Sequence, residues 1–369
     1  MNPKYAPLFQ PFTLNNGVTV KNRLAVAPMT HFGSHADGLI SDQERTFLGN
    51  RAGDMGLFIS AATLVQDGGK AFRGQPEATG EHCLDSLKET AQIIQKQGAK
   101  AILQIHHGGS KAMAELNRRD KISASASEEE GAREASAAEV EELIVSFAQA
   151  ADLAIRAGFD GVEIHGANGY LIQQFYSAQS NRRSDQWGGS LENRMRFPLA
   201  VVDAVAAVRD KHQRNDFIIG YRFSPEEPGA DGLTMADTLA LVDALAVKPL
   251  QYLHVSLWDF YKKARRDGND EYRMKLIHQR INGRLPFIGV SKLYTADDIA
   301  QAWETGWAEF IALGKTVMLN PDLIELIANG REAEIHTHFD WQQTDRYRYT
   351  PAMLAGTRQG MDFYPPARG

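Results

Sequence analysis

The chain has 369 residues, of which 43% are hydrophobic and 23% charged, a composition typical of a globular protein with a large core. Its formal net charge of -6 argues against binding to nucleic acid or an anionic membrane through bulk positive charge. The single cysteine, Cys83, excludes an internal disulfide and a cysteine-rich metal or iron–sulfur centre. Since no apolar run approaches the roughly 18 residues of a membrane span, we expect a cytoplasmic protein with no membrane partner.

The first predicted element is a β-hairpin near the N-terminus. Residues 12–20 alternate apolar and polar side chains around Asn16-Gly17, which is the strongest short-range signal for a hairpin turn. Because the first barrel-type strand follows directly, we expect this hairpin to cover the lower mouth of the structure that comes after it.

From residue 23 onward, short apolar segments alternate with longer amphipathic segments, the pattern of βα units around a parallel sheet. The predicted strands are residues 23–28, 57–62, 101–106, 160–165, 217–223, 251–256, 286–290 and 309–313. The predicted helices include residues 84–98, 136–157, 191–213, 234–246, 295–305 and 321–329. Ser190 and Thr295 are N-cap signals, and Gly98, Gly158 and Gly306 are stop signals. Eight alternations favour a closed (β/α)8 TIM barrel.

We find no internal repeat or linker that would mark a second domain. Residues 1–369 are therefore predicted to form a single (β/α)8 barrel domain, with an N-terminal cap at 1–22, the barrel at 23–329 and a C-terminal extension at 330–369. Two long segments without periodicity, 107–135 and 257–271, follow the third and sixth strands. They should lie over the C-terminal face of the barrel, where enzymes of this fold build their active sites.

The most informative segment is the end of the fourth strand, where Gly161-Val162-Glu163-Ile164-His165 leads into Gly166-Ala167-Asn168-Gly169-Tyr170. A tight turn here can aim the side chains of His165 and Asn168 at one oxygen atom, as in a site that stabilises negative charge on a carbonyl or nitro group. The hydroxyl of Tyr170 can supply a proton to a neighbouring carbon. The alternative is a structural turn with a buried histidine and a packing tyrosine.

This turn and the segment that follows it resemble the Old Yellow Enzyme family, the FMN-dependent ene-reductases that oxidise NADH or NADPH. The resemblance runs from Tyr5 to about Asp322 and includes the long segment from Ser177 to Arg194, SAQSNRRSDQWGGSLENR. It implies that His165 and Asn168 bind the activating oxygen of an alkene and that Tyr170 is the proton donor. Within the long segment, we expect Asn193 and Arg194 to anchor a loop–helix junction.

The resemblance also implies where a tightly bound FMN lies. Ala27-Pro28-Met29-Thr30 at the end of the first strand would run along the flavin ring, with Ala62 and Gln104 at the ends of the second and third strands. Arg222, from the fifth strand, would lie beside the negative charge of the reduced ring. The phosphate would bind the loops after strands seven and eight. Those loops contribute Ser291 and Lys292, and then Leu313, Gly314 and Lys315, where many relatives have arginine in place of Lys315.

Two features of the sequence argue against a metal site and against a separate nicotinamide domain. Neighbouring residues on a strand point to opposite faces, so the pair His106-His107 is not expected to bind a metal ion. No G-x-G-x-x-G segment marks a separate nicotinamide domain, so NADH or NADPH is expected to enter the pocket that the alkene later occupies.

The resulting prediction is an FMN-dependent NAD(P)H oxidoreductase that reduces enones or nitroalkenes. One alternative on the same fold is oxidation of NAD(P)H by oxygen or a quinone. A flavin-free lyase or aldolase with a Schiff base on Lys292 or Lys315 is a more distant alternative, as is a flavin-binding barrel without activity. Homo-oligomers are common among the relatives, and Arg346, Arg348 and Arg358 are candidates to reach a neighbouring site.

Overall fold

The computed structural model describes residues 1–266 and 270–367. The predicted loop 257–271 and C-terminal extension 330–369 therefore include residues, 267–269 and 368–369, that lie outside the described part. In the described part, a ring of parallel strands runs in the order β3, β4, β6, β9, β10, β11, β12 and β13 and closes by pairing of β13 with β3. The prediction of a (β/α)8 barrel is confirmed.

The strands of the ring match the eight predicted segments, usually with slightly shorter bounds. They are β3 (Leu24–Val26), β4 (Leu57–Ile59), β6 (Lys100–His106), β9 (Gly161–Gly166), β10 (Ile218–Phe223), β11 (Tyr252–Val255), β12 (Phe287–Val290) and β13 (Phe310–Leu313). The second predicted strand, 57–62, ends earlier than expected, and a short strand β5 (Thr63–Leu64) then pairs with β6. Almost every strand residue is buried, as expected for parallel strands that are covered on both faces.

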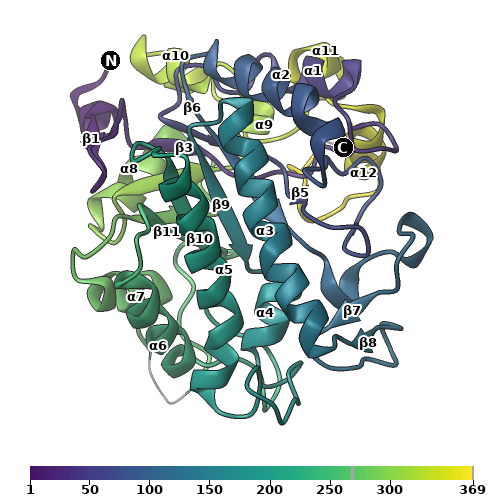
Figure 1. Ribbon diagram of the computed structural model, residues 1–369. Helices are drawn as coiled ribbons and strands as arrows, with labels where there is room; N and C mark the ends of the chain where they lie inside the picture. Colours follow the sequence, from purple (N-terminus) through teal and green to yellow (C-terminus); the bar gives the residue numbers. More distant parts are fainter. Residues whose placement is uncertain (267–269, 368–369) are drawn as a thin grey trace.

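Helices surround the ring, and the long helices α3 and α5 lie side by side in front of β9 and β10 (Figure 1). The helices are α1 (Asp42–Leu48), α2 (Leu84–Gln95), α3 (Ala137–Ala157), α4 (Leu171–Tyr176), α5 (Leu191–Lys211), α6 (Met235–Ala246), α7 (Arg273–Ile281), α8 (Ala296–Glu304), α9 (Lys315–Leu319), α10 (Leu323–Ala328), α11 (Thr344–Tyr347) and α12 (Pro351–Arg358). Ser190 and Thr295 cap α5 and α8, and Gly158 closes α3 with a φ of 86°.

The N-terminal hairpin is confirmed. β1 (Phe12–Thr13) pairs antiparallel with β2 (Thr19–Val20), and Gly17 adopts a φ of 85° in the turn between them. Asn15 Nδ2 donates a hydrogen bond of 2.8 Å to the carbonyl of Leu250, which precedes β11. This contact places the hairpin at the N-terminal end of the barrel, opposite the ends of the strands that carry the candidate site.

The long loop after β6 is anchored to the barrel. It contains two short 3-10 turns, Gly109–Lys111 and Ala114–Leu116, and the paired strands β7 (Ile122–Ser123) and β8 (Arg133–Glu134). The buried guanidinium of Arg183 donates to the carbonyls of Ala124 and Ala135 at 3.0 and 2.6 Å. This part of the chain is therefore attached to the segment that follows α4.

The expected loop–helix junction is also present. Asn193 Nδ2 donates to the carbonyl of Gly188 at 3.0 Å, and Arg194 Nε donates to the carbonyl of Tyr176 at 2.9 Å. Both residues thus satisfy backbone carbonyls where the chain leaves α4 and enters α5. Within residues 1–266 and 270–367, no helix has the length and apolar character that crossing a membrane requires.

Candidate active site

The turn after β9 brings His165, Asn168 and Tyr170 together at the C-terminal end of the barrel. His165 belongs to β9, and Tyr170 is the N-cap residue of α4. Between them, Asn168 and Gly169 have φ angles of 60° and 71°, in the left-handed region that asparagine and glycine tolerate best. The two consecutive left-handed residues reverse the chain within a short turn, so the three predicted side chains share one end of one strand.

His165 is a neutral hydrogen-bond donor. The amide N–H of Ala167 donates to His165 Nδ1 at 3.3 Å, so the proton of the neutral ring is on Nε2. Burial, with a contribution from the charge of Arg222, lowers the pKa of His165 to about 3. No group in the described part of the chain accepts a hydrogen bond from Nε2. A fixed neutral N–H is therefore available to a ligand.

Asn168 presents the second donor. Ser256 Oγ, which follows β11, donates a hydrogen bond of 2.7 Å to Asn168 Oδ1. The hydroxyl of Ser224 after β10 accepts the backbone N–H of Asn168 at 2.9 Å. Because the side-chain oxygen is held in this way, the Nδ2 amide hydrogens remain free among the described residues. Ser256 and Ser224 thus set the orientation of the amide.

Tyr170 lies against both histidines of the site. Its ring is nearly perpendicular to those of His106 and His165, with ring centroids 4.4 and 5.4 Å away. Burial raises the pKa of its phenol above the ordinary value. The hydroxyl therefore stays protonated at neutral pH, as a proton donor requires.

A buried polar network lies below the turn, inside the barrel. The carboxylate of Glu163 accepts hydrogen bonds from Gln104 Nε2 at 2.7 Å, Tyr252 OH at 3.0 Å and His254 Nδ1 at 2.8 Å. Gly220 leaves room for this arrangement, since a Cβ atom there would lie 2.1 Å from the ring of Tyr252. Burial raises the pKa of Glu163, but the surrounding donors and cations outweigh burial and hold this pKa below its ordinary value. Glu163 is therefore a buried anion.

Arg222 is a buried cation whose N–H groups are unused. It pairs with His165 across the β9–β10 ladder and is 8% exposed. Its guanidinium forms no hydrogen bond in the described part of the chain, and its Nε is shielded from solvent. The charge of Glu163 faces it, but an arginine at this depth normally also satisfies its donors. These free donors indicate a site for an electron-rich ligand group.

The ends of β3 and β13 meet at the C-terminal end of the barrel. The backbone N–H of Ala27 donates to the carbonyl of Leu313 at 3.0 Å, and a Cβ atom on Gly314 would lie 3.6 Å from the sulfur of Met29. Ala27 and Met29 therefore lie next to the loop after β13. Ala62 lies between β4 and β5, and its carbonyl accepts from Gln75 Nε2 at 3.1 Å.

The loops after β12 and β13 carry the predicted phosphate-binding residues. Ser291 and Lys292 have φ angles of 91° and 56°, and such strained non-glycine pairs cluster at ligand sites. Lys292 Nζ lies 3.1 Å from the carboxylate of Asp259. Lys315 Nζ donates to the backbone carbonyl of Asp362, and burial lowers the pKa of Lys315 below its ordinary value. The C-terminal segment is thus joined to this end of the barrel.

The adjacent histidines of β6 have different environments. Gln75 Nε2 donates to His106 Nδ1 at 3.0 Å, whereas the backbone N–H of Gly109 donates to His107 Nδ1 at 3.1 Å. Burial lowers the pKa of both imidazoles. His106 packs against Tyr170 in the turn after β9, and a Cβ atom on Gly69 would lie 2.3 Å from the ring of His107.

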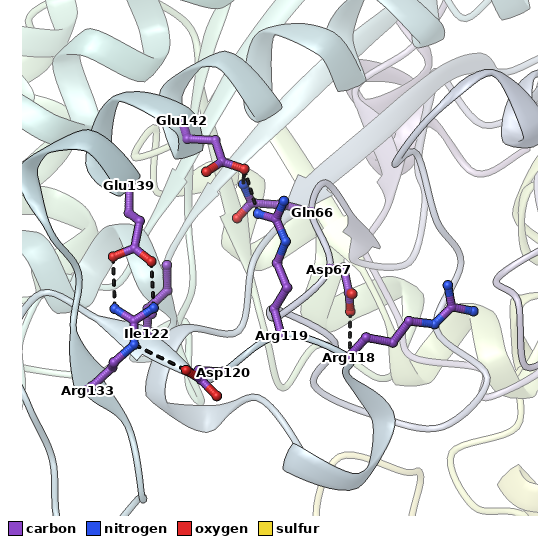
Figure 2. A pocket seen from close by; sticks show the side chains of 9 residues that line it. All are labelled: Gln66, Asp67, Arg118, Arg119, Asp120, Ile122, Arg133, Glu139 and Glu142. Carbon is purple, nitrogen blue, oxygen red and sulfur yellow. Dashed lines mark hydrogen bonds and ion pairs between the residues drawn. The ribbon is translucent and has the colours of Figure 1, made fainter.

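A separate polar hollow of about 420 Å³ lies beside the anchored loop (Figure 2). Its charged walls largely neutralise one another, because Arg119 pairs with Glu142 at 2.5 Å and Arg133 pairs with Glu139 at 2.5 Å. It contains none of the residues of the turn after β9. The candidate site at the strand ends and this hollow are therefore separate features.

Sequence reasoning missed two residues that contact Asn168 in the turn after β9. Ser256 fixes the amide of Asn168, and Lys111 Nζ donates to the backbone carbonyl of Asn168 at 2.9 Å. Ser256 comes directly after a predicted strand, which is the signal that could have identified it. Lys111 stands in a loop segment without any such pattern.

Comparisons with a family model, with other sequences and with solved structures each find a match to this chain. Residues 7–334 match the NADH:flavin oxidoreductase / NADH oxidase family. The probable NADH-dependent flavin oxidoreductase YqiG of Bacillus subtilis (strain 168) is 47% identical over 354 residues, 95% of this chain and 94% of that protein. Morphinone reductase in complex with tetrahydroNAD has a similar structure, with a TM-score of 0.77, 27% identity and coverage of 93% of this chain and 97% of that chain.

One relative is much longer than this chain. The NADH:fumarate oxidoreductase of Klebsiella pneumoniae (strain 342) is 39% identical over 338 residues, which are 89% of this chain but 36% of that protein. The chain therefore spans about a third of that relative's length.

Proposed function

The chain belongs to the NADH:flavin oxidoreductase / NADH oxidase family, as its resemblance to Old Yellow Enzymes indicated, and we propose that it reduces the C=C bond of alkenes activated by a carbonyl or nitro group. As a member of this family, the chain is a flavin-dependent NADH oxidoreductase. The alternatives of a flavin-free lyase or aldolase and of a flavin-binding barrel without activity are therefore excluded. NADH is the hydride donor that the family and YqiG indicate.

The observation that carries the proposal is the pair of free donors next to a protonated phenol. His165 Nε2–H and the Nδ2 hydrogens of the Asn168 amide are neutral donors of fixed orientation, without acceptors among the described residues. Two such donors suit an oxygen atom on which negative charge develops during a reaction. Tyr170 lies beside them and stays protonated.

The residues present fit an FMN. The free N–H groups of Arg222 suit the electron-rich edge of a flavin ring, and Gln104 keeps its side-chain oxygen available as an acceptor. Ala27, Pro28, Met29, Thr30 and Ala62 would border the ring, with Ser291, Lys292, Leu313, Gly314 and Lys315 near the phosphate. A bound FMN accepts hydride from NADH and delivers it to the alkene.

The protein's part in alkene reduction follows from its own groups. His165 and Asn168 hold the carbonyl or nitro oxygen and stabilise the negative charge that it gains as hydride reaches the β-carbon. Tyr170 gives its proton to the α-carbon. Glu163 and its donors hold Gln104 and the interior of the barrel in place, so that the strand ends above them keep a fixed geometry.

The name of the Klebsiella relative supports a substrate with a C=C bond next to a carboxyl group. Fumarate has such a bond, although the match covers only about a third of that protein. We carry over only the general class, an alkene conjugated with a carbonyl carbon.

The test is to follow the visible spectrum of the purified protein. A yellow protein should bleach on anaerobic addition of NADH, and 2-cyclohexenone should restore the oxidised spectrum faster than air or a quinone does. Reoxidation by a quinone or oxygen, with no effect of the enone, would favour the NADH oxidase activity of the same family and contradict alkene reduction.

A further inference from the structure

Lys111 is an exposed lysine that contacts the turn after β9. It ends the 3-10 turn Gly109–Lys111 that follows β6, and its Nζ donates to the backbone carbonyl of Asn168 at 2.9 Å. The same atom lies 5.5 Å from the centroid of the Tyr170 ring, a cation–π distance.

The charge of Lys111 is not neutralised. Two other cations at this end of the barrel have carboxylate partners, Lys292 with Asp259 at 3.1 Å and Arg273 with Glu226 at 2.7 Å. No carboxylate of residues 1–266 or 270–367 forms an ion pair with Lys111, which contacts a carbonyl oxygen and a ring face. His165 and Asn168 are neutral and the charge of Arg222 faces Glu163, so Lys111 adds a positive charge to this turn that no carboxylate of the described residues offsets.

We propose that Lys111 makes the pocket selective for alkenes activated by an ionised carboxylate, an inference that rests on the proposed alkene reduction. An ionised carboxylate activates a C=C bond weakly, because its negative charge opposes the arrival of hydride at the β-carbon. A neighbouring ammonium group offsets this charge as it grows on the carboxylate oxygens. The two neutral donors hold one oxygen, and Lys111 adds the positive charge that they lack.

The reaction balances with the partners already named. NADH supplies two electrons and one hydrogen as hydride, a new C–H bond forms at the β-carbon, and the π bond breaks. The electron pair of that bond takes the proton of Tyr170 at the α-carbon, and solvent then returns a proton to the phenol. The carboxylate keeps its charge from substrate to product, so Lys111 gains and loses no proton.

The test compares fumarate with its dimethyl ester, which has the same C=C bond without the charge. The FMN-loaded enzyme is assayed anaerobically at saturating NADH, and the ratio of kcat/KM for fumarate to kcat/KM for the ester is measured. In Lys111→Met this ratio should fall about 10- to 100-fold, the range of a lost charge-assisted hydrogen bond. Lys111→Arg should keep most of the wild-type ratio. Salt should lower the ratio in the wild type and much less in Lys111→Met.

Lys262→Met is the matched control, because Lys262 is exposed in the loop after β11 and belongs to no part of the proposed site. An equal fall of the ratio in this variant would show a bulk charge effect and overturn the role of Lys111. An unchanged ratio in Lys111→Met would also overturn the role of Lys111. A slower reduction of the flavin by NADH in this variant would overturn it too, because it would show that Lys111 binds the dinucleotide.

The two proposals can fail separately. If the wild type reduces the dimethyl ester and 2-cyclohexenone but not fumarate, the carboxylate inference is wrong and the alkene reductase stands. If it reduces none of the three while it transfers electrons to a quinone, the proposed function itself is wrong.

Discussion

The hydroxyl of Ser256 donates a hydrogen bond of 2.7 Å to Oδ1 of Asn168, although 88 positions separate the two residues in the chain. This bond decides which end of the amide faces the pocket, and it makes Asn168 a donor. Asn168→Gly keeps the left-handed backbone but removes the amide, and should lower kcat/KM for an enone by about 10²- to 10³-fold. Steady-state kinetics on an enone checks this expectation.

Ser256→Ala should also lower kcat/KM for an enone, but by less than Asn168→Gly does. The amide of Asn168 keeps its place but loses its preferred orientation, so we expect kcat/KM to fall by about 5-fold, the value of one net hydrogen bond. Ser256→Thr keeps the hydroxyl and is the matched control. A fall of equal size in Ser256→Thr would mean that packing, and not the hydrogen bond, is responsible.

Tyr170→Phe separates the two half-reactions. Removal of the phenol should slow reoxidation of the reduced flavin by an enone by about 10²- to 10⁴-fold, the usual contribution of a general acid. Reduction of the flavin by NADH should stay near the wild-type rate, because that step requires no proton from Tyr170. Stopped-flow absorbance measures both rates, and Tyr272→Phe, which alters a tyrosine outside the turn, serves as the control. An unchanged rate with the enone would contradict the role of Tyr170.

The pH dependence of alkene reduction should be flat around neutrality. Burial lowers the pKa of His165 to about 3 and raises the pKa of Tyr170 above its ordinary value. His165 therefore stays neutral above that low value, and Tyr170 stays protonated through the ordinary tyrosine range. Single-turnover reoxidation by an enone should show no inflection between about pH 5 and about pH 9. An inflection near pH 6.5 that disappears in His165→Gln would show that the histidine titrates instead.

The barrel could be predicted from the sequence because its strands are buried on both faces and appear as continuous apolar runs, such as Ala101 to Leu103. Several helices were not predicted, among them α4 and α7. All six residues of α4 are buried, so the helix has no polar face and no helical periodicity. In α7, the buried Met274, Ile277 and Ile281 do have helical spacing, so this helix was missed although the sequence carries its signal.

The grouping of His165, Asn168 and Tyr170 could be predicted because the three residues lie within one short segment. Ser256 and Lys111 follow other strands and reach this turn only after the barrel closes, which no local pattern reveals. The free N–H groups of Arg222 are likewise a property of the folded interior. The sequence indicates the residue type, but only the structure shows that the donors have no protein acceptor.

Lys315→Arg should strengthen FMN binding. Lys315 is at the predicted phosphate end and currently donates to the carbonyl of Asp362. An arginine can bind a phosphate through two parallel N–H groups, so we expect the dissociation constant of FMN to fall by about 3- to 10-fold. Lys315→Met should raise this dissociation constant. Fluorescence titration of the apoprotein with FMN measures both, and equal affinities in all three proteins would place the phosphate elsewhere.

Arg222→Lys tests whether the buried cation serves the flavin. The lysine keeps the positive charge that faces Glu163, so the melting temperature of the apoprotein should change little. It loses the planar set of N–H groups, and the dissociation constant of FMN should therefore rise by about 10-fold or more. Arg222→Met removes the positive charge as well and leaves the buried anion Glu163 with its hydrogen-bond donors alone, which should lower the unfolding free energy by up to about 3–5 kcal/mol. Calorimetry of the apoproteins and flavin titrations separate the two effects. Wild-type FMN affinity in Arg222→Lys, with a lowered melting temperature, would show that Arg222 serves only to balance the charge of Glu163.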